Sequence, residues 1–229
     1  MVAYAISWDD AGTRKYETGT DHCVLYLLSE GAYGNGVPWM GLTGVTQSPD
    51  GAEANDMWAD NMKYGTIRSA ETFGGTIEAY QSPAEFDVCD GSIELAKGVT
   101  IGQQPRAKFG FCYRTFIGSD TKAAGDNDTD FKLHLIYGAT AAPSERGYET
   151  VNDSPEGMTL SWEFDTVPVP VTGARATSLV EIDSTQVDKG KLEKFMQILY
   201  GTAASGSSTQ AVKPRLPLPD EIKTFFAAA

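Results

Sequence analysis

The chain has 229 residues, of which 41% are hydrophobic, which is enough for a substantial core and too many for a disordered chain. Its formal net charge of −13 argues against tight binding of DNA or RNA, because an acidic surface repels the phosphate backbone. Most of the excess acid lies in residues 1–100, which carry 15 acids and 5 bases, whereas residues 101–229 carry 16 and 13. The same charge also suits solubility, or a protein that must let nucleic acid pass without sticking.

The first part of the chain is expected to contain an arm and a pair of strands. Residues 1–20 have no sustained hydrophobic period, so they are predicted to form an N-terminal arm. His22–Leu28 is predicted to be a strand covered on both faces, and the Asn35-Gly36 pair to turn the chain into a short strand over Val37–Val45. The acidic, turn-rich residues 47–61 are predicted to be a loop.

The next segment is expected to hold a hairpin and a short helix. Lys63–Tyr80 is predicted to be a hairpin that turns at Phe73-Gly74-Gly75. Ser82-Pro83-Ala84-Glu85 has the order of a helix start, with serine as N-cap, proline at the first helical position and glutamate three residues after the serine. This helix is expected to end near Asp90-Gly91.

The second half shows the alternation of apolar and polar residues that is typical of strands, whose successive side chains point to opposite faces. It is plainest in Met158–Asp165, and Ala107–Ile117, Phe131–Tyr137 and 176–183 are predicted to be strands as well. The apolar face of the Met158–Asp165 strand carries Met158, Leu160, Trp162 and Phe164, and the polar face carries Thr159, Ser161, Glu163 and Asp165. Two prolines in 167–170 end the pairing after this strand.

One long helix is expected near the end of the chain. Lys189–Tyr200 has apolar residues at i, i+3, i+4 and i+7 and is followed by Gly201, which stops the helix. These apolar residues are Leu192, Phe195, Met196 and Leu199. The predicted organisation is an N-terminal arm (1–20), a β-domain (21–201), and a flexible linker with a proline-rich C-terminal segment (202–229), of which residues 202–215 are linker and Leu216–Pro219 is extended.

Strands without alternating crossover helices indicate antiparallel sheets. The sequence therefore predicts a mainly β protein with minor α, in which two packed antiparallel sheets, sandwich-like or barrel-like, are flanked by one main helix. We expect neither a signal peptide nor a membrane span, because no segment approaches the roughly 18 apolar residues that a span needs. Three cysteines, Cys23, Cys89 and Cys112, form no Cys-x-x-Cys pair and suit core or near-surface positions in a reducing cytoplasm.

The sequence does not predict a reaction centre, a metal site or a cofactor site. The only histidines, His22 and His134, do not lie in a recognisable nucleophile context and are expected at the surface. Residues 126–130 resemble the opening of a calcium loop, but Phe131 and Tyr137 occupy the positions where such a loop needs glycine and glutamate.

Two pairs of carboxylates leave a hydrolase open as a class. Glu163 and Asp165, and likewise Glu181 and Asp183, are two apart on predicted strands, so each pair shares a face. Glycosidases also place two carboxylates together. Acids on a wet strand face are more commonly solvated, and we therefore expect no enzymatic activity.

The order of these segments resembles that of the major tail tube proteins of long-tailed, non-contractile bacteriophages, in particular those of phages and prophages of Gram-positive bacteria. The resemblance covers roughly residues 20–200 and rests on a succession of segments, without a single sharp motif. These are the His22–Leu28 strand, Val37–Leu42, Asp60-Asn61 ahead of a hairpin and a short helix (Thr76–Gly91), the Ala107–Ile117 and Phe131–Ala139 pair, the Thr159–Asp165 strand and the Lys189–Gly201 helix.

The resemblance implies a structural subunit that assembles into hexameric rings, whose inner sheets join into one continuous barrel. The rings would stack into a tube around a tape measure protein, bounded by tail terminator and distal tail proteins, and genome DNA would later pass through. The subunit would be made in the bacterial cytoplasm and end in the virion tail. Joining sheets across subunits within a ring removes exposed strand edges. Ring stacking is a contact that repeats without closing, and the segments that could make it are 1–20, 47–61, 118–129 and 202–219.

On this hypothesis, acids that face the lumen repel a polyanion with one charge every ~1.7 Å, so that DNA slides through. The candidate lumen-lining acids are Glu78, Glu163, Asp165, Glu181 and Asp183, although each could instead face outwards. The candidate cations for pairing with acids of a neighbouring subunit are Lys108, Arg114 and Lys132. The main alternative is a soluble β-sandwich that binds carbohydrate or a host surface, with exposed aromatic residues gathered in one concave patch.

Overall fold

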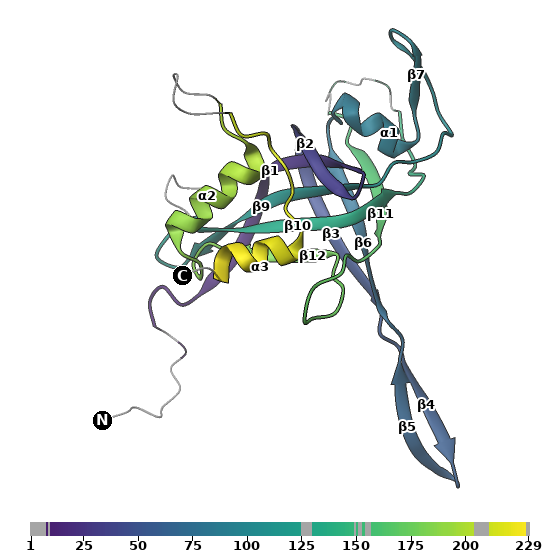
Figure 1. The fold of residues 1–229 in the computed structure, drawn as a ribbon, viewed down its shortest axis with the longest axis vertical. Helices are drawn as coiled ribbons and strands as arrows, with labels where there is room; N and C mark the ends of the chain where they lie inside the picture. Colours follow the sequence, from purple (N-terminus) through teal and green to yellow (C-terminus); the bar gives the residue numbers. More distant parts are fainter. Residues whose placement is uncertain are drawn as a thin grey trace.

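The structure is a computed structural model that describes residues 8, 10–124, 130–148, 150, 153, 157–203 and 211–227. The described residues are mainly β with few helices, as predicted (Figure 1). The strands are β1 (Lys15–Ser29), β2 (Ala32–Pro38), β3 (Leu42–Gly51), β4 (Ala54–Ala59), β5 (Met62–Arg68), β6 (Glu71–Ala79), β7 (Ile93–Ala96), β8 (Val99–Ile101), β9 (Phe109–Ser119), β10 (Asp130–Ala141), β11 (Leu160–Thr166) and β12 (Leu179–Asp183). The helices are the 3-10 turn η1 (Ala84–Phe86), α1 (Asp87–Asp90), α2 (Lys189–Tyr200) and α3 (Pro219–Ala227).

Eight of these strands form one antiparallel sheet in the order β2-β1-β9-β10-β11-β6-β3, with β12 beside β10. Lys132–Ile136 of β10 pair with β12, and only Ala139–Ala141 pair with β11. Between them Gly138 has a φ of 65°, and a Cβ there would lie 2.1 Å from the Val167 carbonyl oxygen, so this bend requires glycine. Where two separate packed sheets were predicted, the structure has two halves of a single sheet that joins through β10.

The two halves of the sheet pack against each other around an aromatic core. This inner core contains Leu25, Phe109 and Phe111 from one half, Ile77, Trp162 and Phe164 from the other, and Trp39 and Phe86 from the connections. The rings of Phe111 and Phe164 meet edge to face with their centroids 5.3 Å apart. Burial of these large rings is the main term that holds the halves together. The alternation predicted for Met158–Asp165 is confirmed over β11.

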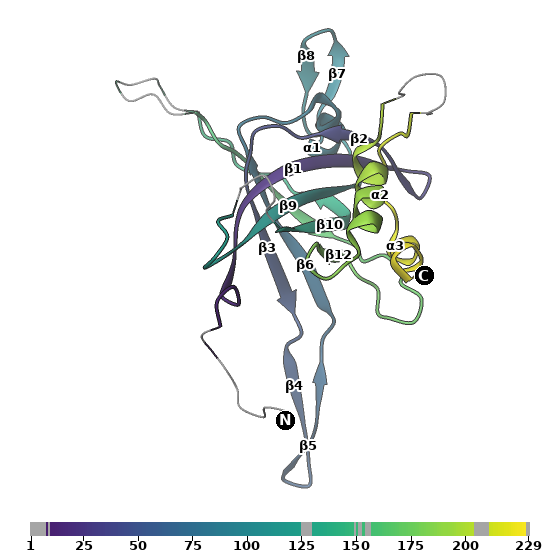
Figure 2. The same ribbon diagram turned by 90° about the vertical axis from the view of Figure 1, so that its left-hand side faces the viewer.

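The opposite face of β1, β9, β10 and β12 is covered by α2 and α3 (Figures 1 and 2). This second core contains Tyr26, Cys112, Leu133, Leu135, Tyr137, Leu192, Phe195, Leu199 and Ile222. The Tyr26 hydroxyl donates a hydrogen bond of 2.7 Å to the Leu199 carbonyl, which ties β1 to α2. Because this half of the sheet is buried on both faces, His22–Leu28 is apolar on both sides, as expected. The three cysteines are free and buried.

Both predicted helices are present. α2 spans Lys189–Tyr200, its N-cap Asp188 accepts a hydrogen bond from the Lys191 backbone N–H at 2.9 Å, and it stops at Gly201. The short helix near residue 85 ends as predicted at Gly91, which has a φ of 76°. Its expected serine cap is absent, because Pro83 occupies the N-cap position and makes no side-chain hydrogen bond.

The flexible linker predicted over 202–215 is wrong for residues 211–215, which pack on the body of the molecule, and the helix that follows Leu218 was not predicted. Leu216 bridges to Tyr33, and Pro219–Ala227 forms α3, which buries Ile222 in the second core. The Tyr137 hydroxyl donates a 2.8 Å hydrogen bond to the Pro217 carbonyl. The C-terminal segment therefore folds back onto its own subunit.

Residues 42–79 differ most from prediction. The expected loop over 47–61 and the hairpin turn at Phe73-Gly74-Gly75 are both wrong, because β3 to β6 form one long antiparallel ribbon. The ribbon turns at Asp60 and Asn61, whose φ values of 50° and 59° are those of a type I′ turn. Its outer part, β4–β5, projects far from the body of the molecule (Figures 1 and 2).

The N-terminal strands also start and turn at other residues than expected. β1 begins at Lys15, so the end of the predicted 1–20 arm belongs to the sheet. The first hairpin turns at Glu30 and Gly31, both with positive φ, and Asn35 lies within β2. The strand predicted over Val37–Val45 is divided between β2 and β3.

Candidate functional surface

The outward face of β3, β6 and β11 is uniformly polar and acidic. In the register of these strands Glu78 lies beside Ser161, Thr76 beside Glu163, and Gly74 beside Asp165. β3 continues the same face with Gly44, Thr46, Ser48 and Asp50. This surface, here called the acidic face, thus carries the acids Asp50, Glu78, Glu163 and Asp165, and its strand positions include no base and no aromatic residue.

Gly74 leaves the middle of the acidic face without a side chain. A Cβ there would lie 2.8 Å from the Phe164 carbonyl oxygen. A hollow of about 490 Å³ lies over this part of the sheet. Asp50, Glu163 and Asp165 line this hollow. It offers carboxylates and hydroxyls, which suit contact with water and small cations and disfavour anions.

The structure thus brings together three of the five candidate lumen acids, Glu78, Glu163 and Asp165. The other two, Glu181 and Asp183, lie on β12 in the other half of the sheet, beside His134 and Lys132 of β10. The Asp183 carboxylate accepts hydrogen bonds from the Thr185 backbone N–H at 2.8 Å and from its hydroxyl at 2.7 Å.

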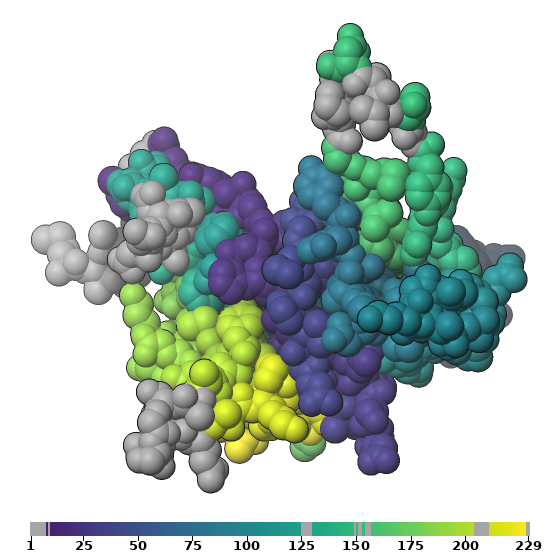
Figure 3. Space-filling view, turned by 90° about the horizontal axis from the view of Figure 1, so that it is seen from above, coloured from purple at the N-terminus to yellow at the C-terminus, as the bar shows by residue number. Residues whose placement is uncertain are grey.

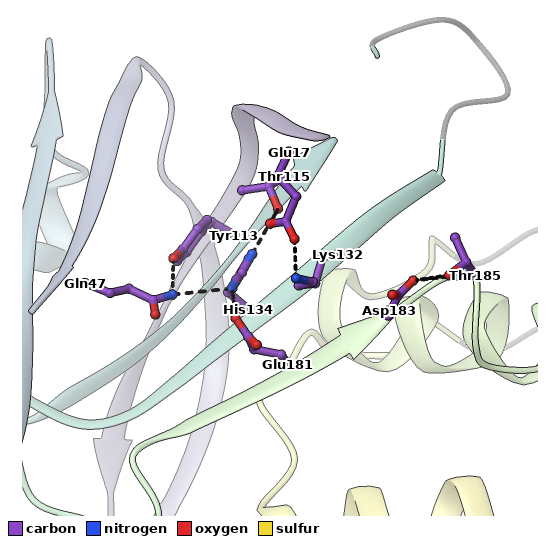
Figure 4. A network of polar contacts seen from close by, with 9 residues as sticks. All are labelled: Glu17, Gln47, Tyr113, Thr115, Lys132, His134, Glu181, Asp183 and Thr185. Atoms are coloured by element: carbon purple, nitrogen blue, oxygen red, sulfur yellow. Dashed lines mark hydrogen bonds and ion pairs between the residues drawn. The ribbon is translucent and has the colours of Figure 1, made fainter. Parts of the chain in front are cut away.

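His134 is the centre of a polar network where the two halves of the sheet meet (Figure 4). Its ring is stacked on Tyr113, with centroids 4.7 Å apart, and its Nδ1 lies 2.9 Å from the Glu181 carboxylate. Its Nε2 lies 3.0 Å from the Thr115 hydroxyl. Gln47, from the other half of the sheet, donates a 2.7 Å hydrogen bond to the Tyr113 hydroxyl. The network therefore links β3 to β9, β10 and β12.

Both histidines were predicted to lie at the surface. This is wrong for His134, which is only 4% exposed, and is confirmed for His22, which is exposed. Burial lowers the pKa of His134, and this outweighs the opposing effect of the carboxylates of Glu181 and Glu17. The imidazole is therefore neutral at pH 7, which lets it donate from Nδ1 to Glu181 and accept from Thr115.

Thr115, His134 and Glu181 are in the order hydroxyl, imidazole, carboxylate, as in the triads of hydrolases. The Thr115 hydroxyl, however, also lies 3.3 Å from the Glu17 carboxylate, which in turn pairs with Lys132. A carboxylate beside the hydroxyl would repel the oxyanion that acyl transfer forms. The arrangement therefore suits a structural link better than nucleophilic catalysis.

Two of the three candidate inter-subunit cations have partners in their own subunit. Arg114 donates to both oxygens of Asp21, at 2.8 and 2.7 Å, and lies over the rings of Phe116 and Phe131. Burial opposes ionisation of Asp21, but the hydrogen bonds and charges of Arg114 and His22 together lower its pKa. Lys132 pairs with Glu17. Of the three, only Lys108 is exposed, and its pairing with a neighbouring subunit stays a prediction.

Two hairpins leave the body of the molecule. They are β4–β5 and the smaller β7–β8, and each carries exposed apolar side chains. Sequence reasoning proposed residues 47–61, which include part of the first hairpin, as a contact segment but as a loop, and it missed the second hairpin. The Asp60-Asn61 pair, which suits a tight turn, was the available signal for the first. For β7–β8 the signal was Lys97-Gly98, whose glycine takes a φ of 77° between two short apolar runs.

Within the described residues, no group of three or more histidine, cysteine or acidic side chains could hold a metal ion. The segment that resembles a calcium loop lies mostly outside the described residues. Among the helices that the structure describes, none has the length and apolar character needed to cross a membrane.

A scan against protein-family models found no family that matches the chain, and a search of curated proteins found no match either. Inferences about function therefore rest on the surfaces described above and on the resemblance in the order of segments.

Proposed function

We propose that this chain is the structural subunit of a phage tail tube, which assembles as stacked hexameric rings and lets genome DNA pass during ejection. The acidic face of β3, β6 and β11 is the observation on which this proposal rests. It presents Asp50, Glu78, Glu163 and Asp165 without a compensating base on the same strands. Turned towards a bore, such a face keeps the DNA backbone hydrated and unbound.

The ends of the sheet supply a means of joining subunits. Among the described residues β3 forms strand pairs only with β6, so the other edge of Leu42–Gly51 has no strand partner there. Lys15–Asp21 of β1 pair on one side with β9. The other side of β1 is covered from Cys23 onwards, where the Trp39 backbone N–H donates to the Cys23 carbonyl at 2.8 Å and β2 continues the pairing. Long open edges invite pairing with another chain. In the proposed ring, such pairing between copies continues the acidic face from subunit to subunit.

The further partners come from the resemblance alone. They are the tape measure protein inside the tube, the tail terminator and distal tail proteins at its ends, and DNA in transit. The location that follows is the tail of a virion assembled in a bacterial cytoplasm. In this role the protein performs no catalysis and uses no cofactor.

The alternative of a carbohydrate-binding module has less support. It needs exposed aromatic residues gathered around one concave site. The hollow on the acidic face is lined by carboxylates, hydroxyls and glycine, with Phe73 and Phe164 as its only rings. Exposed aromatics such as Trp58 and Tyr64 lie instead on the projecting β4–β5 hairpin, away from that hollow. Binding to a glycan array would favour this alternative.

The proposal is tested in two steps. Negative-stain microscopy of concentrated pure protein is expected to show rings or tubes, and a protein that stays monomeric under every condition would overturn it. Particles with Glu163→Lys and Asp165→Lys are then expected to assemble normally but to eject DNA more slowly. Glu193→Lys, an exposed acid on α2, is the matched control. Normal ejection from the first particles would refute the acidic bore.

A further inference from the structure

The two projecting hairpins lie at opposite ends of the molecule. In Figures 1 and 2, which differ by a quarter turn about the long axis, β7–β8 stands at the top and β4–β5 at the bottom, nearly in line. In Figure 3, the view from above, the residues of β7–β8 (teal) are in front, and no other described segment covers them. A shift of one copy along the long axis would therefore bring the β4–β5 hairpin of one molecule to the β7–β8 hairpin of the next.

The β4–β5 hairpin has one apolar face. Asn55 pairs with Ile67, Met57 with Gly65 and Ala59 with Met62, so Met57, Met62 and Ile67 share a side. These three side chains are between 41% and 62% exposed. The opposite side combines Trp58, which is 69% exposed, with polar contacts such as the Lys63–Asp56 ion pair at 2.8 Å.

The β7–β8 hairpin repeats this design on a smaller scale. Ile93 pairs with Ile101 and Ala96 with Val99, which places Ile93, Val99 and Ile101 on one side. Ile93 and Val99 are 42% and 54% exposed. Glu94 and Thr100 pair on the other side. A two-stranded hairpin detached from the core is marginally stable alone, so uncovered apolar faces on both hairpins indicate that each packs against something.

The formal charge of each hairpin is balanced. On β4–β5, Lys63 and Arg68 are matched by Asp56 and Asp60, and Lys63 pairs with Asp56 at 2.8 Å. On β7–β8, Glu94 is matched by Lys97. Neither hairpin therefore carries a net charge that would repel the other, and apolar packing can decide the contact.

We propose that the apolar face of β4–β5 in one copy packs on the apolar face of β7–β8 in the next copy, head to tail along the long axis. The surfaces differ, so the contact is heterologous and repeats without closing, which produces filaments. The inference deepens the proposed function, because it identifies the surfaces through which successive rings of the tube would join.

The test uses two single-cysteine variants, Met62→Cys and Val99→Cys, which are mixed and oxidised mildly. The three native cysteines are buried, so the introduced thiols are the ones that react. The mixture is expected to form a disulfide-linked dimer that neither variant forms alone. The matched control is a mixture of Thr66→Cys and Thr100→Cys, which places the thiols on the polar faces of the same hairpins.

We expect the yield of linked dimer to exceed that of the control by about tenfold, because the contact raises the effective concentration of the paired thiols. Equal yields in the two mixtures, or efficient dimers from Met62→Cys alone, would overturn the proposal. If wild-type protein forms tubes and Met62→Cys and Val99→Cys do not link, only this inference fails. If wild-type protein forms no rings or tubes, the proposed function fails, whatever the cross-linking shows.

Discussion

At the scale of single residues, His134 makes stability depend on pH. Its pKa in the folded protein lies below the ordinary value of 6.5, because burial disfavours the imidazolium. The unfolded chain therefore binds more protons than the folded chain as pH falls through 6.5. The groups that face the ring are Glu181, Glu17, Lys132 and Tyr113. The contribution of neutral His134 is fully present above this pH and is lost as pH falls towards the lower, folded pKa.

We expect the free energy of unfolding, measured with urea, to decrease from about pH 7 to about pH 5 in wild-type protein. His134→Gln is expected to flatten this decrease, since glutamine cannot take up a proton. His22→Gln, which changes the exposed histidine, serves as the comparison, and the slope is expected to flatten more in His134→Gln than in His22→Gln. An unchanged slope in His134→Gln would show that other groups cause the dependence.

Gly75 is required by the close approach of two strands. A Cβ at this position would lie 2.1 Å from the Thr46 carbonyl oxygen, and also 3.0 Å from the Phe164 ring. Gly75→Ala is therefore expected to destabilise the protein by roughly 3 kcal/mol, measured by urea unfolding. The matched control is Gly34→Ala, where an added Cβ meets nothing within 4 Å. Equal stability of both variants would show that β3 and β6 can separate at little cost.

The buried network around His134 could not be predicted from local sequence. On β10 the residue alternates with Leu133 and Leu135, and that pattern gives an ordinary polar face. Its partners come from β1, β3, β9 and β12, so burial depends on how distant strands meet. The position of Glu163 and Asp165 on the same exposed face of β11, in contrast, follows from the alternation of side chains along a strand and was predicted correctly.

At the scale of elements, α3 is an integral part of the second core. Ile222 is 6% exposed, and the neighbouring Pro217 carbonyl accepts a hydrogen bond from Tyr137. Ile222→Ala is expected to cost about 2–4 kcal/mol in urea unfolding, as is usual for a large aliphatic residue removed from a core. Leu218→Ala truncates a 40% exposed neighbour and is expected to cost less than roughly 1 kcal/mol. Similar small effects of both substitutions would indicate that α3 docks only weakly.

Elements with strong internal signals were predictable, and those defined by pairing were less so. α2 has a cap, a helical period and a terminal glycine, so its bounds follow from its own sequence. Residues 42–79 are rich in glycine, threonine and acids, which are also typical of loops. They form a ribbon because β3 and β6 pair along their whole length, and Gly74 and Gly75 are required by neighbouring strands.

At the scale of the whole molecule, one half of the sheet is covered by apolar cores on both faces, whereas the other half is covered on one face only. β1, β9, β10 and β12 lie between the inner core and the two helices. β3, β6 and β11 have the inner core on one side only and leave the acidic face open. The sequence could predict polar strand faces. It could not predict which of them would be continuous, because continuity depends on the strand order.

The projecting β4–β5 hairpin is expected to be dispensable for folding and necessary for tube growth. Excision of residues 54–68, with Glu53 joined to Ser69 through Asn-Gly, removes almost only exposed side chains. The Ser69 backbone N–H donates to the Glu53 carbonyl at 3.1 Å and the Glu53 N–H donates to the Ser69 hydroxyl at 3.0 Å, so a type I′ turn fits between them. The unfolding temperature is expected to stay within about 3 °C of wild type.

In negative-stain microscopy the excised protein is expected to give rings at most and no extended tubes, because β3 keeps its open edge while the contact along the long axis is lost. Thr66→Ala, on the polar face of the intact hairpin, is the control that should still form tubes. Tubes of normal length from the excised protein would show that the hairpin has no part in assembly. A large drop in its unfolding temperature would mean instead that the hairpin supports the sheet.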